Sequence, residues 1–89
     1  MYRIIDNRGS GKTGRLMLLA KETNSAIACS NPLAMKQKAY AYGITGIDFI
    51  SYDDLIHGWD CNVMIDELEM FIKYATSAEV MGYTLSNED

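Results

Sequence analysis

The chain has 89 residues, of which 48% are hydrophobic and 22% are charged. That mixture is typical of one small globular domain, and it excludes a disordered tail, a fibrous repeat and a membrane-spanning protein. The net charge is −4, which argues against strong unaided binding of nucleic acid, because such binding depends on Lys and Arg side chains at phosphates. A domain this small buries a modest share of its surface, so it needs an efficient core or a partner.

Two features of the chain predict where the protein works. Cys29 and Cys61 have neither metal-binding nor redox spacing, which predicts free thiols in a cytoplasmic protein. The first residues lack the basic start and the apolar stretch of a signal peptide, so we expect no export.

Predicted strands and helices alternate along the whole chain. Short apolar runs predict strands at residues 2–5, 26–29, 47–51, 61–65 and 79–85. Between them, apolar residues at helical spacing predict helices at residues 12–23, 32–43, 52–57 and 66–74. Ser30 or Asn31 before Pro32, and Ser51 before Tyr52, are typical helix-capping signals. Because the strands are too apolar to be half-exposed, the sequence predicts one α/β domain over residues 1–89 with a mainly parallel sheet.

A glycine-rich loop lies between the first predicted strand and the first predicted helix. Its glycines allow the backbone N–H groups to curl around a phosphate, and the start of the helix adds a partial positive charge. Lys12 is then placed to reach the β- and γ-phosphates of a nucleotide, and the Thr13 hydroxyl is placed to bind Mg²⁺. The loop and the first residues of the helix read Gly9-Ser10-Gly11-Lys12-Thr13-Gly14.

One position departs from the phosphate-binding pattern G-x-x-x-x-G-K-[ST]. Asp6 stands where that pattern has its first glycine. A carboxylate pointing inward would repel phosphate, so we expect Asp6 to turn away or to pair with Arg8 or Lys12. The alternative is a glycine-rich turn that only begins an ordinary helix. The order of strand, loop and helix favours phosphate binding instead.

An acidic pair follows the predicted strand at residues 61–65. Asp66 and Glu67 come directly after this apolar run. Beside a phosphate loop, Asp66 is placed to hold Mg²⁺, and Glu67 is placed to orient or deprotonate an attacking water. Acidic residues are common in the first turn of any helix, so the acidic pair indicates a functional site only together with the upstream glycine-rich loop.

Together the two motifs resemble those of the P-loop NTPases, with residues 9–13 as the Walker A element and residues 64–67 as the Walker B element. An acid after the Walker B Asp, and a strand inserted between the motifs, are similar to the additional-strand, catalytic-glutamate division, which includes helicases, terminases and AAA+ proteins. This resemblance implies a minimal three-layer fold with a mainly parallel five-stranded sheet in the order 5-1-4-3-2, flanked by helices. It covers residues 2–86 and looks closest to small phage-encoded P-loop proteins, which would work in the host cytoplasm.

The resemblance also implies roles outside the two motifs. Arg8 is similar to a P-loop arginine of phage terminase motors that is implicated in stabilising the transition state. The alternative is an exposed or Asp6-paired arginine. Thr84 or Ser86, at the end of the last predicted strand, would be the sensor of the γ-phosphate, although hydroxyl groups are common at strand ends.

The leading hypothesis is a Mg²⁺-dependent ATPase. Lys12, Arg8 and Glu67 are its candidate catalytic residues, and Thr13 and Asp66 are its candidate metal ligands. The candidate nucleotide-binding residues are Arg8, Gly9, Ser10, Gly11, Lys12, Thr13 and Gly14. ATP is favoured over GTP because the chain has no Asn-Lys-x-Asp element for guanine.

Two alternatives stay open. The first is a regulatory or interaction protein that has the P-loop fold without hydrolysing nucleotide, which the position of Asp6 favours. The second is a helicase-like or DNA-packaging accessory that works as an oligomer. Since a nucleotide-binding core would use the whole chain, we expect a protein partner or a homo-oligomer. The charge does not favour nucleic acid, and nothing indicates a membrane.

Overall fold

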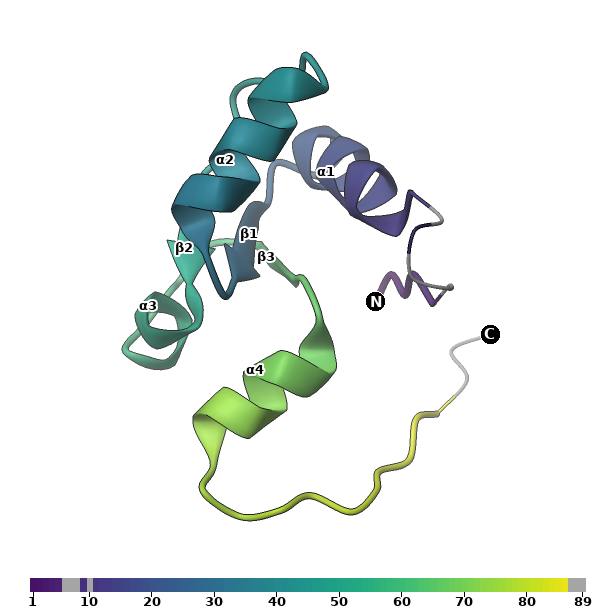
Figure 1. Ribbon diagram of the computed structural model, residues 1–89, viewed down its shortest axis with the longest axis vertical. Helices are drawn as coiled ribbons and strands as arrows, with labels where there is room; N and C mark the ends of the chain where they lie inside the picture. Colours follow the sequence, from purple (N-terminus) through teal and green to yellow (C-terminus); the bar gives the residue numbers. More distant parts are fainter. Residues whose placement is uncertain (6–8, 10, 87–89) are drawn as a thin grey trace.

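A three-stranded parallel sheet forms the centre of the computed structural model (Figure 1). The central strand is β1 (Ala26–Cys29), which pairs with β2 (Phe49–Ser51) on one side and with β3 (Val63–Ile65) on the other. In this register Ile27 lies opposite Phe49 and Met64. The structure describes residues 1–5, 9 and 11–86.

Helices cover both faces of this sheet, so the predicted α/β class is confirmed. α1 (Lys12–Glu22) and α2 (Pro32–Ala41) pack against one face, whereas α3 (Tyr52–Ile56) and α4 (Leu68–Ala75) lie against the other. The buried side chains on the first face are Met17, Ala20, Ile27, Cys29, Met35 and Ala39. Those on the second face are Ala28, Ile50 and Tyr52.

The helix caps lie where the sequence predicts them. Asn31 precedes α2, and its side chain accepts a hydrogen bond from the Ala34 amide at 3.1 Å. Ser51 precedes α3 and forms a reciprocal capping box with Asp54. α4 begins later than predicted, because Asp66 and Glu67 belong to the turn between β3 and the helix.

The prediction of five strands is wrong. Residues 2–5 and 79–85 form no strand, and the side chains of Tyr2, Ile5 and Met81 are largely exposed. An apolar run forms a strand only where it can pair with the edge of a neighbouring strand and where other elements bury its side chains. β3 is three residues long and only partly buried, so a further strand beside it would gain few hydrogen bonds and little burial.

The predicted strand order is also wrong. The order 5-1-4-3-2 places residues 61–65 beside residues 47–51, whereas the structure inserts β1 between these two strands. All four residues of β1 are buried, while β2 and β3 are partly exposed. A strand covered on both faces along its whole length suits the centre of a sheet, and strands with partial burial suit its edges.

Residues near the two ends of the described chain, Arg3 and Ser86, are in contact. From Thr76 to Ser86 the chain has no regular structure and returns toward the N-terminal residues (Figure 1), where the Arg3 guanidinium donates a hydrogen bond to the Ser86 carbonyl. In the described part of the chain, no helix combines the length and the apolar character that crossing a bilayer requires. Cys29 and Cys61 are free thiols, as their spacing predicts.

Candidate functional site

The glycine loop has the backbone geometry that only glycine adopts easily. Gly9 and Gly11 both have a φ of +83°, in the left-handed region where a side chain would be strained. Gly11 is the N-cap residue of α1, and the described residues supply no side-chain capping hydrogen bond at that end of the helix. The first N–H groups of a helix have no partner within the helix. The start of α1 can therefore offer N–H groups to an anion, and phosphate binding there stays a prediction.

The loop is only partly described. Asp6, Arg8 and Ser10, for which the sequence predicts roles, lie outside the described residues. Gly14 lies in the first turn of α1, and a Cβ atom at this position would contact the Tyr42 ring at 3.7 Å. The start of α1 thus packs beside the end of α2.

The acidic turn after β3 has an unusual backbone. The Asp66 amide donates to the Ala28 carbonyl at 2.9 Å and so extends the pairing of β3 with β1. Glu67 has a φ of +56° and a ψ of +71°, a left-handed conformation that is uncommon for residues other than glycine. Its carbonyl accepts hydrogen bonds from the amides of Met70 and Phe71 at 2.9 and 3.2 Å. Glu67 is therefore held in a strained conformation at the start of α4.

The structure brings the glycine loop and the acidic turn together. The Lys12 ammonium lies 3.2 Å from Oε1 of Glu67, with the two side chains 27% and 41% exposed. α1 contacts both β1 and β3, which places its first residue beside the end of β3. Residues from two motifs far apart in the sequence thus form one ion pair at one end of the sheet.

Asp66 is a partly buried carboxyl group of the site. Burial raises the pKa of this carboxyl above its ordinary value, and the neighbouring charge of Glu67 raises it further, while Lys12 and Lys38 act in the opposite direction. The carboxylate of Asp66 is therefore costly to ionise in this protein without an additional cation.

The same negative charge affects two buried neighbours of Asp66. The pKa of the Cys29 thiol rises to about 11, through burial and then through Asp66. The pKa of the Tyr52 phenol rises to about 12 for the same two reasons, with smaller effects of Cys29 and Glu67. Both groups stay protonated at neutral pH, so Cys29 is no nucleophile here and Tyr52 keeps a proton to donate.

The donor set fits a magnesium ion that arrives with phosphates. The described residues contain no cluster of three or more His, Cys, Asp or Glu side chains able to hold a metal ion. Mg²⁺ is usually bound through one or two carboxylates together with waters and substrate phosphates, rather than in an all-protein cage. Asp66 could supply such a carboxylate, and Thr13 follows Lys12 at the start of α1.

The candidate sensor residues lie in the irregular C-terminal segment. Thr84 and Ser86 are exposed, and the strand expected to carry them is not formed. The contact described above for Ser86 uses its backbone carbonyl rather than its hydroxyl. The structure therefore does not place either hydroxyl at a strand end, and the sensor role stays a prediction.

Tyr52 is a residue of the site that the sequence motifs do not reveal. Its packing in the core is expected, and its side chain is 4% exposed. Its hydroxyl also donates to the Asp66 carbonyl at 2.6 Å and lies 3.4 Å from the Glu67 carbonyl. The sequence signal is its position directly after β2, because the ends of parallel strands meet at one edge of the sheet.

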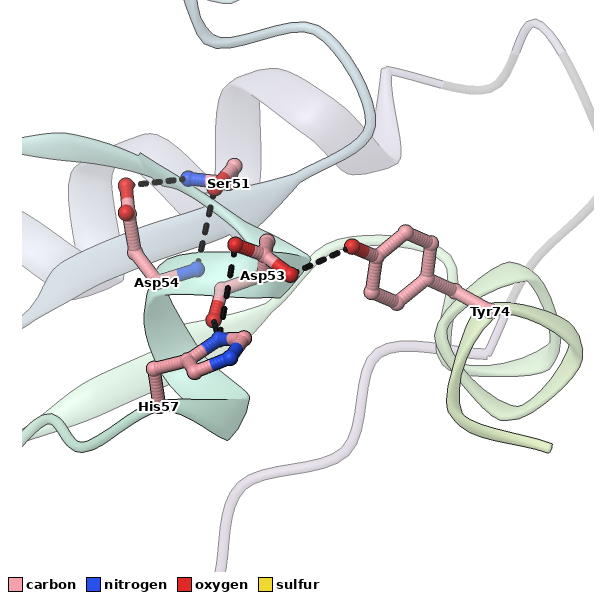
Figure 2. A network of polar contacts seen from close by, with 5 residues as sticks. All are labelled: Ser51, Asp53, Asp54, His57 and Tyr74. Atoms are coloured by element: carbon pink, nitrogen blue, oxygen red, sulfur yellow. Dashed lines mark hydrogen bonds and ion pairs between the residues drawn. The ribbon is translucent and has the colours of Figure 1, made fainter.

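A polar network links α3 with α4 beside this turn (Figure 2). The Tyr74 hydroxyl of α4 donates to Oδ1 of Asp53 at 2.7 Å, which raises the pKa of Tyr74. The His57 ring, at the end of α3, lies 2.8 Å from the Asp53 carbonyl and 3.4 Å from its Oδ2. These contacts fix α4 against α3 and are too exposed to form a chemical site of their own.

No family model, curated protein or solved structure matches this chain. The basis for a function is therefore the set of features above. They are the glycines at an uncapped helix start, the contact of Lys12 with Glu67, and the partly buried Asp66.

Proposed function

We propose that this protein is a minimal P-loop domain that binds ATP with Mg²⁺ and hydrolyses it. The observation that carries the proposal is the 3.2 Å contact between Lys12 and Glu67. It joins the residue expected on the phosphates to the residue expected on the attacking water. Two motifs that are each common by chance are thereby brought to one place, where the proposed chemistry needs both.

Phosphate binding starts from the positive end of the site. The uncapped first turn of α1 offers backbone N–H groups, and Lys12 offers an ammonium group. In the ligand-free protein this ammonium is neutralised by Glu67. A triphosphate carries more negative charge than one carboxylate, so it competes for Lys12 and releases the Glu67 side chain. The released carboxylate is then available to accept a proton from water.

Thr13 and Asp66 would hold Mg²⁺ in the bound state. The ion supplies positive charge to the β- and γ-phosphates and fixes their position. A cation beside Asp66 also offsets the burial and the repulsion by Glu67 that make this carboxylate costly. Arg8 would stabilise the charge of the transition state, and Thr84 or Ser86 would act as sensor after an ordering of the C-terminal segment.

Turnover by four purified proteins tests the proposal. Lys12→Ala should abolish nucleotide binding, because it removes the ammonium group from the phosphate site. Glu67→Gln should keep binding and lower phosphate release by about 10²- to 10⁴-fold, the usual contribution of a general base. Lys21→Ala, at the other end of α1, is the matched control and should behave like the wild type. Equal phosphate release from all four proteins would refute the proposal.

The alternative is a binding or regulatory protein that does not hydrolyse nucleotide. For either function, the exposed apolar side chains favour a protein partner. The chain ends expose large apolar groups that a monomer would normally cover. These are Met1, Tyr2, Ile5, Met81, Tyr83 and Leu85. Calorimetric titration with Mg–ATP and a non-hydrolysable analogue separates the two functions. Tight binding of both without turnover supports the alternative, and DNA-stimulated turnover would instead support the helicase-like or packaging role.

A further inference from the structure

The Tyr52 side chain contacts the backbone of the acidic turn, which is formed by Asp66 and Glu67. Tyr52 is the first residue of α3 and follows β2 directly. Its side chain is almost completely buried, so its hydroxyl has a fixed place and requires a partner. That partner is the Asp66 carbonyl, at 2.6 Å.

The carbonyl that Tyr52 binds belongs to the peptide group between Asp66 and Glu67. The orientation of this peptide plane sets the φ angle of Glu67, because the plane ends at the Glu67 nitrogen. On the other side of Asp66, its amide is fixed by the Ala28 carbonyl at 2.9 Å. Tyr52 thus fixes the second of the two peptide groups around Asp66, the one that precedes a left-handed residue.

The ring of Tyr52 packs against the helix that follows the turn. It meets the Phe71 ring edge-on, with centroids 5.4 Å apart and planes at 70°. It also lies 6.0 Å from the Tyr74 ring. Both partners belong to α4, which Glu67 begins. One side chain therefore holds the turn by its hydroxyl and the helix by its ring.

We propose that Tyr52 is the positioning residue of the acidic turn, and that its hydroxyl holds the peptide before Glu67 in the orientation that directs the Glu67 carboxylate toward Lys12. The effect of this role on turnover rests on the proposed function. The effect on the backbone does not, because it concerns only the conformation of the ligand-free protein.

The backbone effect is tested by amide hydrogen exchange of Tyr52→Phe, which keeps the ring and removes the hydroxyl. If Glu67 leaves its left-handed conformation, its carbonyl no longer accepts from the amides of Met70 and Phe71. We expect these two amides to exchange about tenfold faster, the order expected for one lost hydrogen bond, while amides of α1 are unchanged. Tyr74→Phe, which also removes one phenol hydroxyl beside α4, is the control and should leave both amides at the wild-type rate. Wild-type exchange of Met70 and Phe71 in Tyr52→Phe would overturn the proposal.

The catalytic effect is tested by a double-mutant cycle with Glu67→Gln. Tyr52→Phe alone should lower kcat for ATP about tenfold and leave KM unchanged, because Lys12 and the start of α1 still hold the phosphates. In the Glu67→Gln background the same substitution should have no further effect, since Tyr52 acts through Glu67. Equal losses in both backgrounds would show a merely structural role and overturn the proposal. If the wild type itself shows no turnover, the proposed function fails and the exchange experiment alone decides the role of Tyr52.

Discussion

The left-handed conformation of Glu67 leads to a stability prediction that reverses the usual ranking of alanine and glycine. A non-glycine residue in this region costs roughly 1–2 kcal/mol, and Glu67 has φ and ψ angles of +56° and +71°. Alanine at this position keeps that cost, whereas glycine removes it. Both variants lose the ion pair with Lys12, so its contribution cancels in the comparison.

The magnitude follows from two opposing terms. Glycine relieves the strain of the left-handed conformation, but it also gives the unfolded chain about 0.4–1 kcal/mol of additional conformational freedom. We therefore expect Glu67→Gly to have an unfolding free energy about 1 kcal/mol higher than that of Glu67→Ala. In a domain of this size that difference corresponds to about 4–8 °C in the midpoint of thermal unfolding.

Urea unfolding of four variants provides the assay, with Glu69 as the matched position. Glu69 lies in the first turn of α4 and does not have a positive φ, so glycine there is less favourable than alanine. The sign of the glycine–alanine difference should therefore be opposite at residues 67 and 69. If alanine is the more stable residue at both positions, the left-handed conformation of Glu67 is not a property of the folded protein, and the reasoning on the acidic turn fails.

Two further predictions concern the pKa of Asp66 and the glycines at the start of α1. A raised pKa means that the folded protein binds the Asp66 proton more tightly than the unfolded chain does, so ionisation of this group lowers stability as the pH rises above its ordinary value of 3.8. Asp66→Asn should therefore raise the urea midpoint of the nucleotide-free protein at pH 7, and this increase should disappear below pH 3.8. An equal increase at all pH values would contradict the raised pKa of Asp66. Gly11→Ala should cost about 1 kcal/mol or more in unfolding free energy, because φ is +83°, whereas Gly14→Ala should gain up to about 1 kcal/mol, since its Cβ would make an ordinary contact with Tyr42. Thermal unfolding checks both, and the same sign for the two glycines would refute the assignment of their conformations.

Local signals account for the part of the fold that the sequence predicts. Asn31 and Ser51 cap their helices because a side-chain oxygen near the start of a helix finds its partner within a few residues. The strand at residues 26–29 is predicted because its apolar run stays buried whichever strands flank it.

Strand pairing depends on information that a short apolar run does not contain. Residues 2–5 and 79–85 are apolar enough to predict strands, yet each would need an edge to join, and the partly buried β3 offers only three residues. The order of strands fails for a related reason. Burial on both faces of β1 comes from four helices at once, and no single window of sequence encodes it.

The candidate site likewise has one part that the sequence motifs predict and another part that depends on contacts between distant elements. The sequence predicts that the two motifs serve one site, and in the structure Lys12 lies beside Glu67 although residues 2–5 form no strand. The packing of α1 on β1 and β3 is sufficient to place Lys12. The left-handed conformation of Glu67 and the hydrogen bond from Tyr52 could not be predicted, because they arise from contacts between elements distant in the chain.

The charge balance at this end of the sheet bears on how a nucleotide would enter. Asp66 and Glu67 are neighbours, and among the described residues Lys12 forms an ion pair with Glu67. A nucleotide without a metal ion would take Lys12 from Glu67 and leave two carboxylates facing its phosphates, which repel one another in partly buried surroundings. Under the proposed function, a magnesium ion held by Asp66 would supply positive charge there when the phosphates withdraw Lys12 from Glu67. Under the proposed function, the same electrostatics that pair Lys12 with Glu67 in the ligand-free protein would favour entry of the metal–nucleotide complex over entry of the nucleotide alone.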